Sequence, residues 1–419
     1  MAPKNQESTK EPAWWGATPD WTPLAAKQAY RNAQAGNLQT AADLCDALRS
    51  DARIRSCLNT RANALLGCPL EFEGAGDGRK RTGVIKALDD GGEFWEMVPE
   101  AEATQVLTWG WLLNMGPGEL VWRREDGVWK QRLVPKHPRN LRFDYVTRGW
   151  KLMVDSGKEI DFTPGDGHWV LFQPFGANNP WTHGLWWALT LLYLAKAYAD
   201  FDWGRRNEAR GRAALVGTTP DGAVDTDRDE FARQIASLRT QLGIALPSGY
   251  DLKAVDFGGD DHETFSTRID KADASIAILL LGQNLSTEVK GGSFAAAKSH
   301  ESVRQDYLER DAEGFATWCR AEVLRPWANV RFGDHENAPW PVWDTEPPED
   351  LVQAADTTKK ASEALALLLA KGVQVDVTAY CERFNIPLLE TKTPVVALAP
   401  ADEPGPASDD DAAPADKDA

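Results

Sequence analysis

The chain has 419 residues, 42% of them hydrophobic and 9% aromatic, which is enough to bury a large core in two or more packed regions. Its 46 Lys and Arg against 63 Asp and Glu give a formal net charge of −17, which argues against a protein that grips DNA through a broad basic surface. This balance still permits a protein past which DNA slides. Part of the charge is local, because residues 391–419 are acidic and lack aromatic side chains, and we expect them to form a disordered tail.

We expect neither a secretion signal nor a membrane partner. The first ten residues are polar, and the longest apolar run, 185–199, is interrupted by Lys196 and is too short to cross a bilayer. The cysteines are odd in number and scattered, with no CxxC pair, so we predict reduced thiols in a cytosolic setting. They are Cys45, Cys57, Cys68, Cys319 and Cys381.

The N-terminal part reads as an arm followed by a helix. Residues 1–39 begin with closely spaced Pro and Trp, and we predict an irregular arm. From 40 to 66 the apolar residues recur at helical spacing, with Arg53, Arg55 and Arg61 off the apolar face. Gly67 and Pro69 then end this predicted helix.

Residues 70–173 change to a period close to two, which is typical of strands. Segments 119–124 and 128–134 flank Glu125-Asp126-Gly127, a hairpin signal, and further short strands are predicted at 141–145, 150–154 and 168–173. One helix, near 101–114, interrupts them. We therefore predict an α+β fold with an antiparallel sheet over 40–183.

Two long helices then bracket a small module. The first, 184–210, is apolar over much of its girth, so it needs cover on more than one side. The second, 259–282, carries apolar residues at helical spacing. Between them, 211–258 is predicted to hold a helix near 227–242 and strands near 213–217, 244–246 and 252–257.

The remainder is mostly helical. A glycine-containing loop, 283–297, precedes a helix that we expect Pro326 to break, and a Pro/Trp-rich link completes the segment 298–354. A last helical unit is predicted over 355–390, with helices at 361–371 and 377–384.

Motifs for catalysis are weak. The sequence contains no GxxxxGK[ST], HExxH or GxSxG motif. Asp260-Asp261-His262-Glu263 is the best metal cluster, but adjacent acids at a helix start are more often caps. Ser293 with His300 lacks a third orienting group. We expect no enzymatic activity, no catalytic residue, no metal and no cofactor. A metal-dependent hydrolase built on the 260–263 cluster stays open as an alternative.

The segment IAILLLGQNLSTEVKGGSFAAAKSHESVRQDYLERDA (276–312), followed by LRPWANVRFG (324–333), strongly resembles the portal proteins of tailed bacteriophages, particularly the Mu-like branch. Segments 51–73, 207–217, 246–256 and 371–387 extend the resemblance in order over most of 40–390. It does not cover the Trp-rich arm or the acidic tail.

This resemblance implies a portal fold and a structural channel. Residues 40–183 and 298–354 would form the wing and its link, 184–210 and 259–282 the two stem helices, and 211–258 the clip. The helices at 355–390 would be crown-like. The protein would form a dodecameric ring at one capsid vertex of a virion, assembled in the host cytoplasm, and conduct double-stranded DNA in packaging and ejection.

The implied partners are further copies of the chain, the major capsid and scaffold proteins, the terminase large subunit, neck or adaptor proteins, and double-stranded DNA bound without sequence preference. The tunnel loop, 283–297, would lie nearest the DNA. Its expected contact residues are Asn284, Ser286, Thr287, Lys290, Gly291, Gly292 and Ser293, with Lys298 just beyond. A scaffold without a pore remains the second alternative, and only ring symmetry separates it from the channel.

Overall fold

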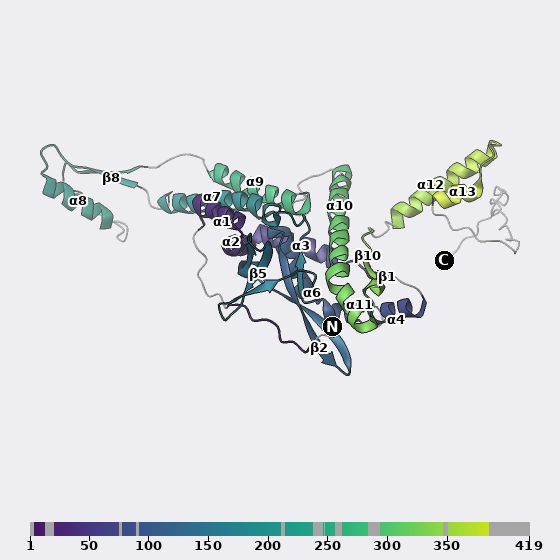
Figure 1. The fold of residues 1–419 in the computed structure, drawn as a ribbon. Helices are drawn as coiled ribbons and strands as arrows, with labels where there is room; N and C mark the ends of the chain where they lie inside the picture. The colour runs from purple at the N-terminus through teal and green to yellow at the C-terminus, as the bar shows by residue number, and fades with distance from the viewer. Residues whose placement is uncertain are drawn as a thin grey trace, which may run out of the picture. The chain divides into compact units, whose positions relative to one another are not determined.

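The computed structural model shows a mixed helix and sheet protein (Figure 1). It divides into two compact units, residues 1–346 and 347–419. The structure describes residues 4–12, 21–74, 78–88, 92–210, 214–237, 246, 248–255, 262–283, 294–346 and 351–384.

The first part of the larger unit alternates helices and short strands. Its elements are α1 (Pro23–Gln34), α2 (Gln39–Ser50), α3 (Ala52–Leu66), β1 (Leu70–Glu73), α4 (Gly78–Leu88), α5 (Glu93–Met97), α6 (Glu100–Leu113), β2 (Gly116–Glu125), β3 (Val128–Pro135), β4 (Leu141–Asp144), β5 (Gly149–Met153), β6 (Glu159–Phe162) and β7 (Trp169–Phe172). Single helical turns lie at η1 (Pro138–Asn140) and η2 (Pro180–Thr182).

The second part is dominated by long helices. Its elements are α7 (Trp186–Arg210), β8 (Ala214–Thr218), α8 (Asp225–Ser237), β9 (Asp251–Val255), α9 (His262–Leu281), α10 (Phe294–Trp318), the π-helix η3 (Cys319–Leu324), α11 (Arg325–Phe332), the turn η4 (His335–Asn337) and β10 (Trp340–Trp343). The smaller unit contributes α12 (Leu351–Ala370) and α13 (Val377–Arg383).

The strands of the first half form small antiparallel sheets, as the alternating pattern predicts. One has the order β3-β2-β7, with β2 and β3 in register from Gly118↔Pro135 to Glu125↔Val128. A second has the order β4-β5-β6, and β6 was not predicted. The hairpin turn adopts positive φ at Asp126 (49°) and Gly127 (81°), the backbone that the Asp-Gly pair favours.

Helix α6 lies at the centre of the core. It is buried on nearly every side, including its two tryptophans, Trp109 and Trp111. It packs against β2, β3 and α3, so one contiguous apolar core joins the sheet to the helices. Truncating such a ring to Ala typically costs about 3–5 kcal/mol, which makes α6 the main source of rigidity for the elements around it.

Two N-terminal predictions were wrong in detail. Part of the segment expected to be irregular, Pro23–Gln34, is helix α1, because Thr22 caps it and its alanines pack into the core. The single helix expected over 40–66 is two helices. Asp51 breaks it, since its side-chain oxygen accepts hydrogen bonds from the amides of Arg53 (2.9 Å) and Ile54 (3.0 Å) and so caps α3.

Two C-terminal predictions were also wrong. The Pro/Trp-rich link contains strand β10, which pairs with β1 in a register set by partners about 270 residues apart in the sequence. Pro326 does not break the helix. It lies in α11, which directly follows the π-helical turn η3, and the helix continues through it although proline has no amide hydrogen to donate.

The module between the long helices holds a two-stranded sheet, β8 and β9, covered by α8. Gly217 faces Phe231 and Ile235 of α8, and a Cβ there would collide with Phe231, so close packing requires glycine. The strand predicted near 244–246 falls largely outside the described residues. All five cysteines are described, and each is free.

Glu322 is a half-buried acid that has no ion-pair partner among the described residues. It lies in η3 and accepts a hydrogen bond from the amide of Leu171 at 2.6 Å. It also lines a groove of ≈ 900 Å³ between the end of β7 and α10. Burial raises the pKa of Glu322 to about 7.

Replacing Glu322 with Gln should stabilise the protein above pH 7. The folded state keeps this proton up to about pH 7, whereas the unfolded chain releases it near its ordinary value of 4.5. The unfolding free energy of the wild type therefore falls as pH rises between these values, and E322Q removes that fall, by on the order of 2–3 kcal/mol at pH 8. Urea unfolding, followed by tryptophan fluorescence at several pH values, measures the difference in unfolding free energy between E322Q and the wild type.

The matched control is E313Q, which makes the same charge change at an exposed position of α10. It should shift the unfolding free energy by less than about 0.5 kcal/mol. Equal effects of the two variants at pH 8 would contradict the role given to burial at Glu322.

Candidate functional site

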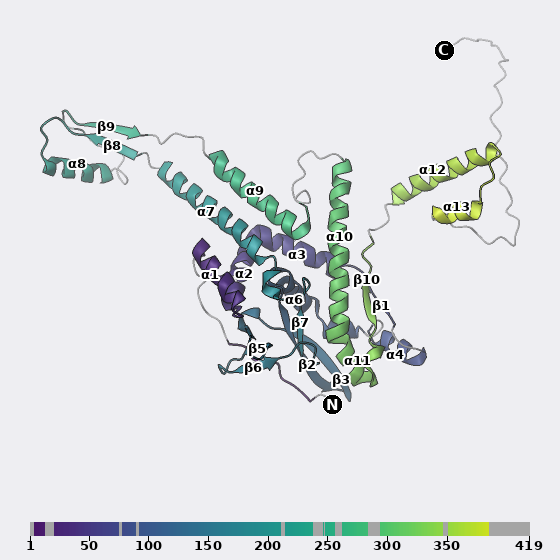
Figure 2. The same cartoon turned by 45° about the horizontal axis from the view of Figure 1, so that its top comes forward.

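Helices α7 and α9 run side by side in opposite directions (Figure 2). Lys196 joins them at mid-length, with its Nζ 2.7 Å from Oδ1 of Asp273 on α9 and 2.9 Å from Oδ2 of Asp51 at the start of α3. Burial alone would lower the pKa of Lys196, but hydrogen bonds to both carboxylates outweigh it and raise that pKa. A charged cluster thus ties the helix pair to the start of α3.

The outward stripe of α7 is apolar. Ala188, Leu191, Ala195 and Tyr198 recur three or four residues apart and therefore share one face. Leu191 is 55% exposed and Tyr198 43% exposed, although both are large apolar side chains. Farther along the helix Phe201 is also exposed. A contiguous apolar stripe of this kind is typical of a surface that another protein covers.

The outward stripe of α9 is mostly polar. Its exposed residues are Thr264, Thr267, Arg268, Lys271, Ser275 and, near the end of the helix, Ile278, and the exposed acid Asp270 lies at its edge. The acid Asp273 lies on another side of the helix, where it pairs with Lys196. Between Thr264 and Ser275 the stripe itself carries hydroxyls and two cations. The two helices therefore offer chemically different faces.

The segment 284–293 is held at its start by a buried ion pair. Arg61 of α3 binds Asp311 of α10 through two hydrogen bonds, Nε to Oδ2 at 2.6 Å and Nη2 to Oδ1 at 2.9 Å. Its third contact, from Nη1, is to the carbonyl oxygen of Leu280 at the end of α9 (3.1 Å). Trp111 of α6 also donates to Oδ1 of Asp311 (3.2 Å). Four helices thus meet at one guanidinium group.

Gly282 closes α9 with a left-handed backbone, φ 75°. A Cβ at this position would lie 2.7 Å from Cγ1 of Val303, so the chain can turn against α10 only without a side chain. The next residue, Gln283, is buried. The last described residues before the segment are therefore fixed in place.

Most of the predicted contact residues fall outside the described part of the chain. Asn284, Ser286, Thr287, Lys290, Gly291, Gly292 and Ser293 lie in 284–293. Lys298 is in the first turns of α10, where the structure does not describe its side chain. For these residues the role predicted from the sequence remains a prediction.

The alternative metal cluster falls at a similar boundary. Asp260 and Asp261 lie outside the described residues, whereas His262 and Glu263 begin α9 without described side chains. Among the side chains that the structure does describe, no three His, Cys, Asp or Glu come together as metal ligands. Within the same residues, no helix is both long and apolar enough to span a bilayer.

The Arg61–Asp311 ion pair was not predicted from the sequence. Arg61 was expected on the outer face of its helix, but it is only 8% exposed, as is Asp311. Its planar group also stacks over the rings of Trp111 (4.7 Å) and Tyr307 (5.1 Å). No local signal marks such a pair, because its partners come from helices 250 residues apart.

The family model of the portal protein of Mu bacteriophage matches residues 42–386. The chain belongs to this family. The portal protein of Escherichia phage Mu is 22% identical over 392 residues, which cover 87% of this chain and 71% of that protein. The Mu-like prophage FluMu protein gp29 of Haemophilus influenzae is 25% identical over 182 residues, covering 42% of this chain and 35% of that protein.

Solved structures also resemble this portal-family chain. An HK97 family phage portal protein from Corynebacterium diphtheriae is 12% identical, with a TM-score of 0.43 over 71% of this chain and 93% of that one. The neck of a native gene transfer agent particle, computed with C12 symmetry, is 16% identical, with a TM-score of 0.48 over 88% and 95%. Both TM-scores are below 0.5, so the family assignment rests on the sequence.

The family match confirms the resemblance to Mu-like phage portal proteins and the predicted association with a virion. The α+β class is likewise confirmed by the described elements. The family match also favours a structural portal over a hydrolase.

Replacing Arg61 with Met should destabilise this portal-family chain by about 3–5 kcal/mol, because Asp311 would stay buried without its cation. Urea unfolding measures the change. The double variant R61M/D311L removes both charges and should recover part of the loss. The control is K130M, which breaks the exposed pair of Lys130 with Glu96 and should cost at most about 1 kcal/mol. Equal costs for R61M and K130M would contradict the structural role of Arg61.

Proposed function

We propose that copies of this chain close into a ring around a channel that conducts double-stranded DNA at one vertex of a phage-type capsid. The observation that carries this proposal is the contrast between the outward stripes of α7 and α9. One stripe is apolar and uncovered, and the other combines hydroxyls with cations.

The α7 stripe supports lateral packing of identical copies. An exposed row of Leu191 and Tyr198 gains free energy when apolar surface covers it, at about 25 cal/mol per Å². In a ring of more than two copies, the stripe meets a different surface of the neighbouring copy. Contacts between two different surfaces of the same protein are head-to-tail and close into rings when the rotation permits. The α7 stripe is therefore the proposed boundary between neighbours.

The α9 stripe is the proposed wall of the channel. Arg268 and Lys271 form no ion pair with another described residue, and their exposed neighbours on α9 are the hydroxyls of Thr267 and Ser275 and one acid, Asp270. Each neutralised phosphate adds salt-sensitive affinity, and a large basic surface would hold DNA in place. Two cations per copy among hydroxyls give contacts that are weak and easily exchanged. Such a wall suits DNA that must move.

The segment 284–293, with Lys298, is proposed to be the tunnel loop nearest the DNA. The hold on Leu280 and Gly282 supports this role, because it gives the start of the segment a rigid base. Movement of the loop would then leave the wing undisturbed. The sequence-based contact residues Asn284 to Ser293 remain its proposed DNA-facing groups.

The remaining assignments follow from the family and are also proposals. The ring would contain twelve copies, β8, α8 and β9 would form the clip that docks the terminase large subunit and the neck proteins, and α12 with α13 would form the crown. The capsid and scaffold proteins would meet the wing. In this function the chain has no catalytic step of its own, since an ATP-driven terminase supplies the work.

Replacing Leu191 with Glu should abolish ring formation. The charge would be placed in the proposed boundary, where its burial without a partner is costly. The matched control is S275E, an equally exposed outward position on α9, and it should still form rings. Mass photometry and negative-stain images of both variants measure the outcome. Rings without a central hole would favour the pore-less scaffold, and rings formed by L191E would place the boundary elsewhere.

Replacing both Arg268 and Lys271 with Gln should weaken non-specific binding of the ring to short duplex DNA and lower its salt dependence. The control R148Q/K158Q removes the same charges from exposed turns of the β4-β5-β6 sheet and should leave the binding curve near that of the wild type. Fluorescence anisotropy over a range of salt concentrations gives, for each variant, the slope of the logarithm of the binding constant against the logarithm of the salt concentration. Similar losses in the two double variants would argue that α9 does not face DNA.

A further inference from the structure

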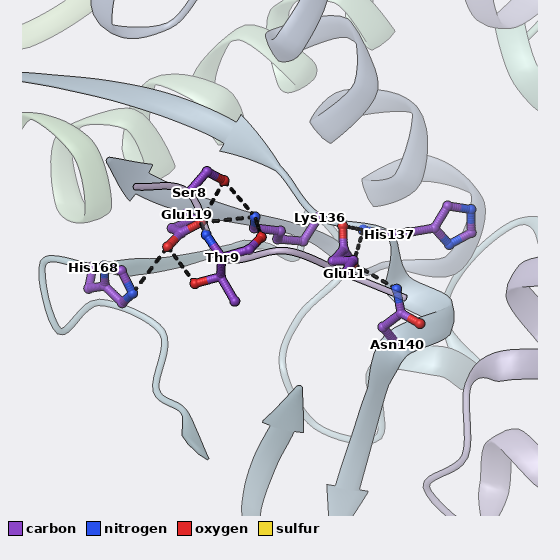
Figure 3. Close-up of polar contacts among 8 residues, drawn as sticks. All are labelled: Ser8, Thr9, Glu11, Glu119, Lys136, His137, Asn140 and His168. Atoms are coloured by element: carbon purple, nitrogen blue, oxygen red, sulfur yellow. Dashed lines mark hydrogen bonds and ion pairs between the residues drawn. The ribbon is translucent and has the colours of Figure 1, made fainter. Parts of the chain in front are cut away.

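Residues 4–12 lie extended across the wing sheet (Figure 3). Strand β7 pairs with β2 only from Gly116 to Glu119, and beyond this point the N-terminal segment takes the free edge. The amide of Gln6 donates to the carbonyl oxygen of Trp122 (2.9 Å), and the amide of Arg124 donates to Oδ1 of Asn5 (2.9 Å). One main-chain and one side-chain hydrogen bond thus hold the start of the segment against the edge of β2.

A buried ion pair binds the middle of the segment, at Ser8 and Thr9. Glu119 is 1% exposed and Lys136 3% exposed, and their charged atoms are 2.9 Å apart. Oε2 of Glu119 accepts from Oγ of Ser8 (3.0 Å) and from the amide of Thr9 (2.8 Å), while Oε1 accepts from Oγ1 of Thr9 (2.8 Å). Lys136 donates to Oγ of Ser8 (2.9 Å) and to the carbonyl oxygen of Thr9 (2.6 Å). The pair therefore recognises two adjacent hydroxyl residues.

A second recognition point follows two residues later. The carboxylate of Glu11 accepts from the amide of His137 (3.0 Å) and from Nδ2 of Asn140 (2.8 Å). The carbonyl oxygen of Lys10 accepts from the amide of Asp155 (3.0 Å). Burial alone would raise the pKa of Glu119, but Lys136 and Thr9 outweigh it and lower that pKa. The groove is thus specific for this segment, and an empty groove would uncover a buried charge pair.

We propose that in the ring this groove is filled by the N-terminal segment of a neighbouring copy. This inference rests on the proposed function, because it requires neighbours. The contacts are the same whether the segment comes from its own chain or from the next one, and such exchange of an identical element costs little. Residues 4–12 of each copy would then hold it to the next copy around the ring.

The path of the chain supports the exchange. Residues 13–20 connect the segment to α1, and nine steps of backbone span up to about 30 Å. Helix α1 packs on α7, with the rings of Tyr30 and Trp187 4.9 Å apart. The connection therefore enters the fold beside the helix that forms the proposed boundary. Leu24, in the first turn of α1, is 76% exposed, as expected for a residue that a neighbour covers.

The test is a photo-cross-link in the full chain. A p-benzoylphenylalanine at Gln6 lies against Trp122, and irradiated rings are run on a denaturing gel. Exchange predicts covalent products of two and more chains. Rings that give only products of monomer size would overturn the exchange and leave the proposed function standing. A sample that holds only monomers by mass photometry would overturn both.

A variant pair shows that the cross-link reports this groove. S8A/T9V removes the two hydroxyls that bind Glu119 and should lower the yield of two-chain product several-fold. E7A changes an exposed neighbouring position in the same segment and should leave the yield unchanged. Neither variant alters the wing itself. Equal yields from S8A/T9V and the unsubstituted chain would overturn the proposal, because the inter-chain product would then come from another contact.

Discussion

The guanidinium group of Arg61 links the parts of this protein that must keep their geometry. Through Asp311 it joins α3 to α10, through Leu280 it holds the end of α9, and Trp111 adds α6 to the same point. Arg suits this place because its fixed fork of donors meets a carboxylate and a carbonyl oxygen at once, which Lys could not do. Leu280 lies four residues before 284–293, so the pair fixes the backbone from which that segment starts.

The helix pair presents two different outward faces. The stripe on α7 is apolar and gains free energy when it is covered, whereas the stripe on α9 is mostly polar and stays compatible with water. The link between the two helices is Lys196, which binds Asp51 and Asp273 on the inner side of the pair.

The N-terminal segment has a defined place beside the β3-β2-β7 sheet. Glu119, the last residue of β2 that pairs with β7, and Lys136, directly after β3, are buried and bind Ser8 and Thr9. A buried ion pair contributes more to specificity than to stability, since it tolerates only a partner that satisfies its remaining bonds. Ser8 and Thr9 do so, which gives the otherwise irregular start of the chain a defined place.

The sequence by itself determined the class of the fold, the β2–β3 hairpin and the two long helices, because hydrophobic period, turn residues and glycines are local signals. It also showed that the chain belongs to the Mu portal protein family. Only the tertiary structure decided that β10 pairs with β1, that Pro326 continues a helix, and that Arg61 points inward to Asp311. It likewise decided which side of α7 and of α9 stays outside. These features depend on partners far away in the chain, and a charged residue on a helix looks the same in the sequence whether it faces water or a buried carboxylate.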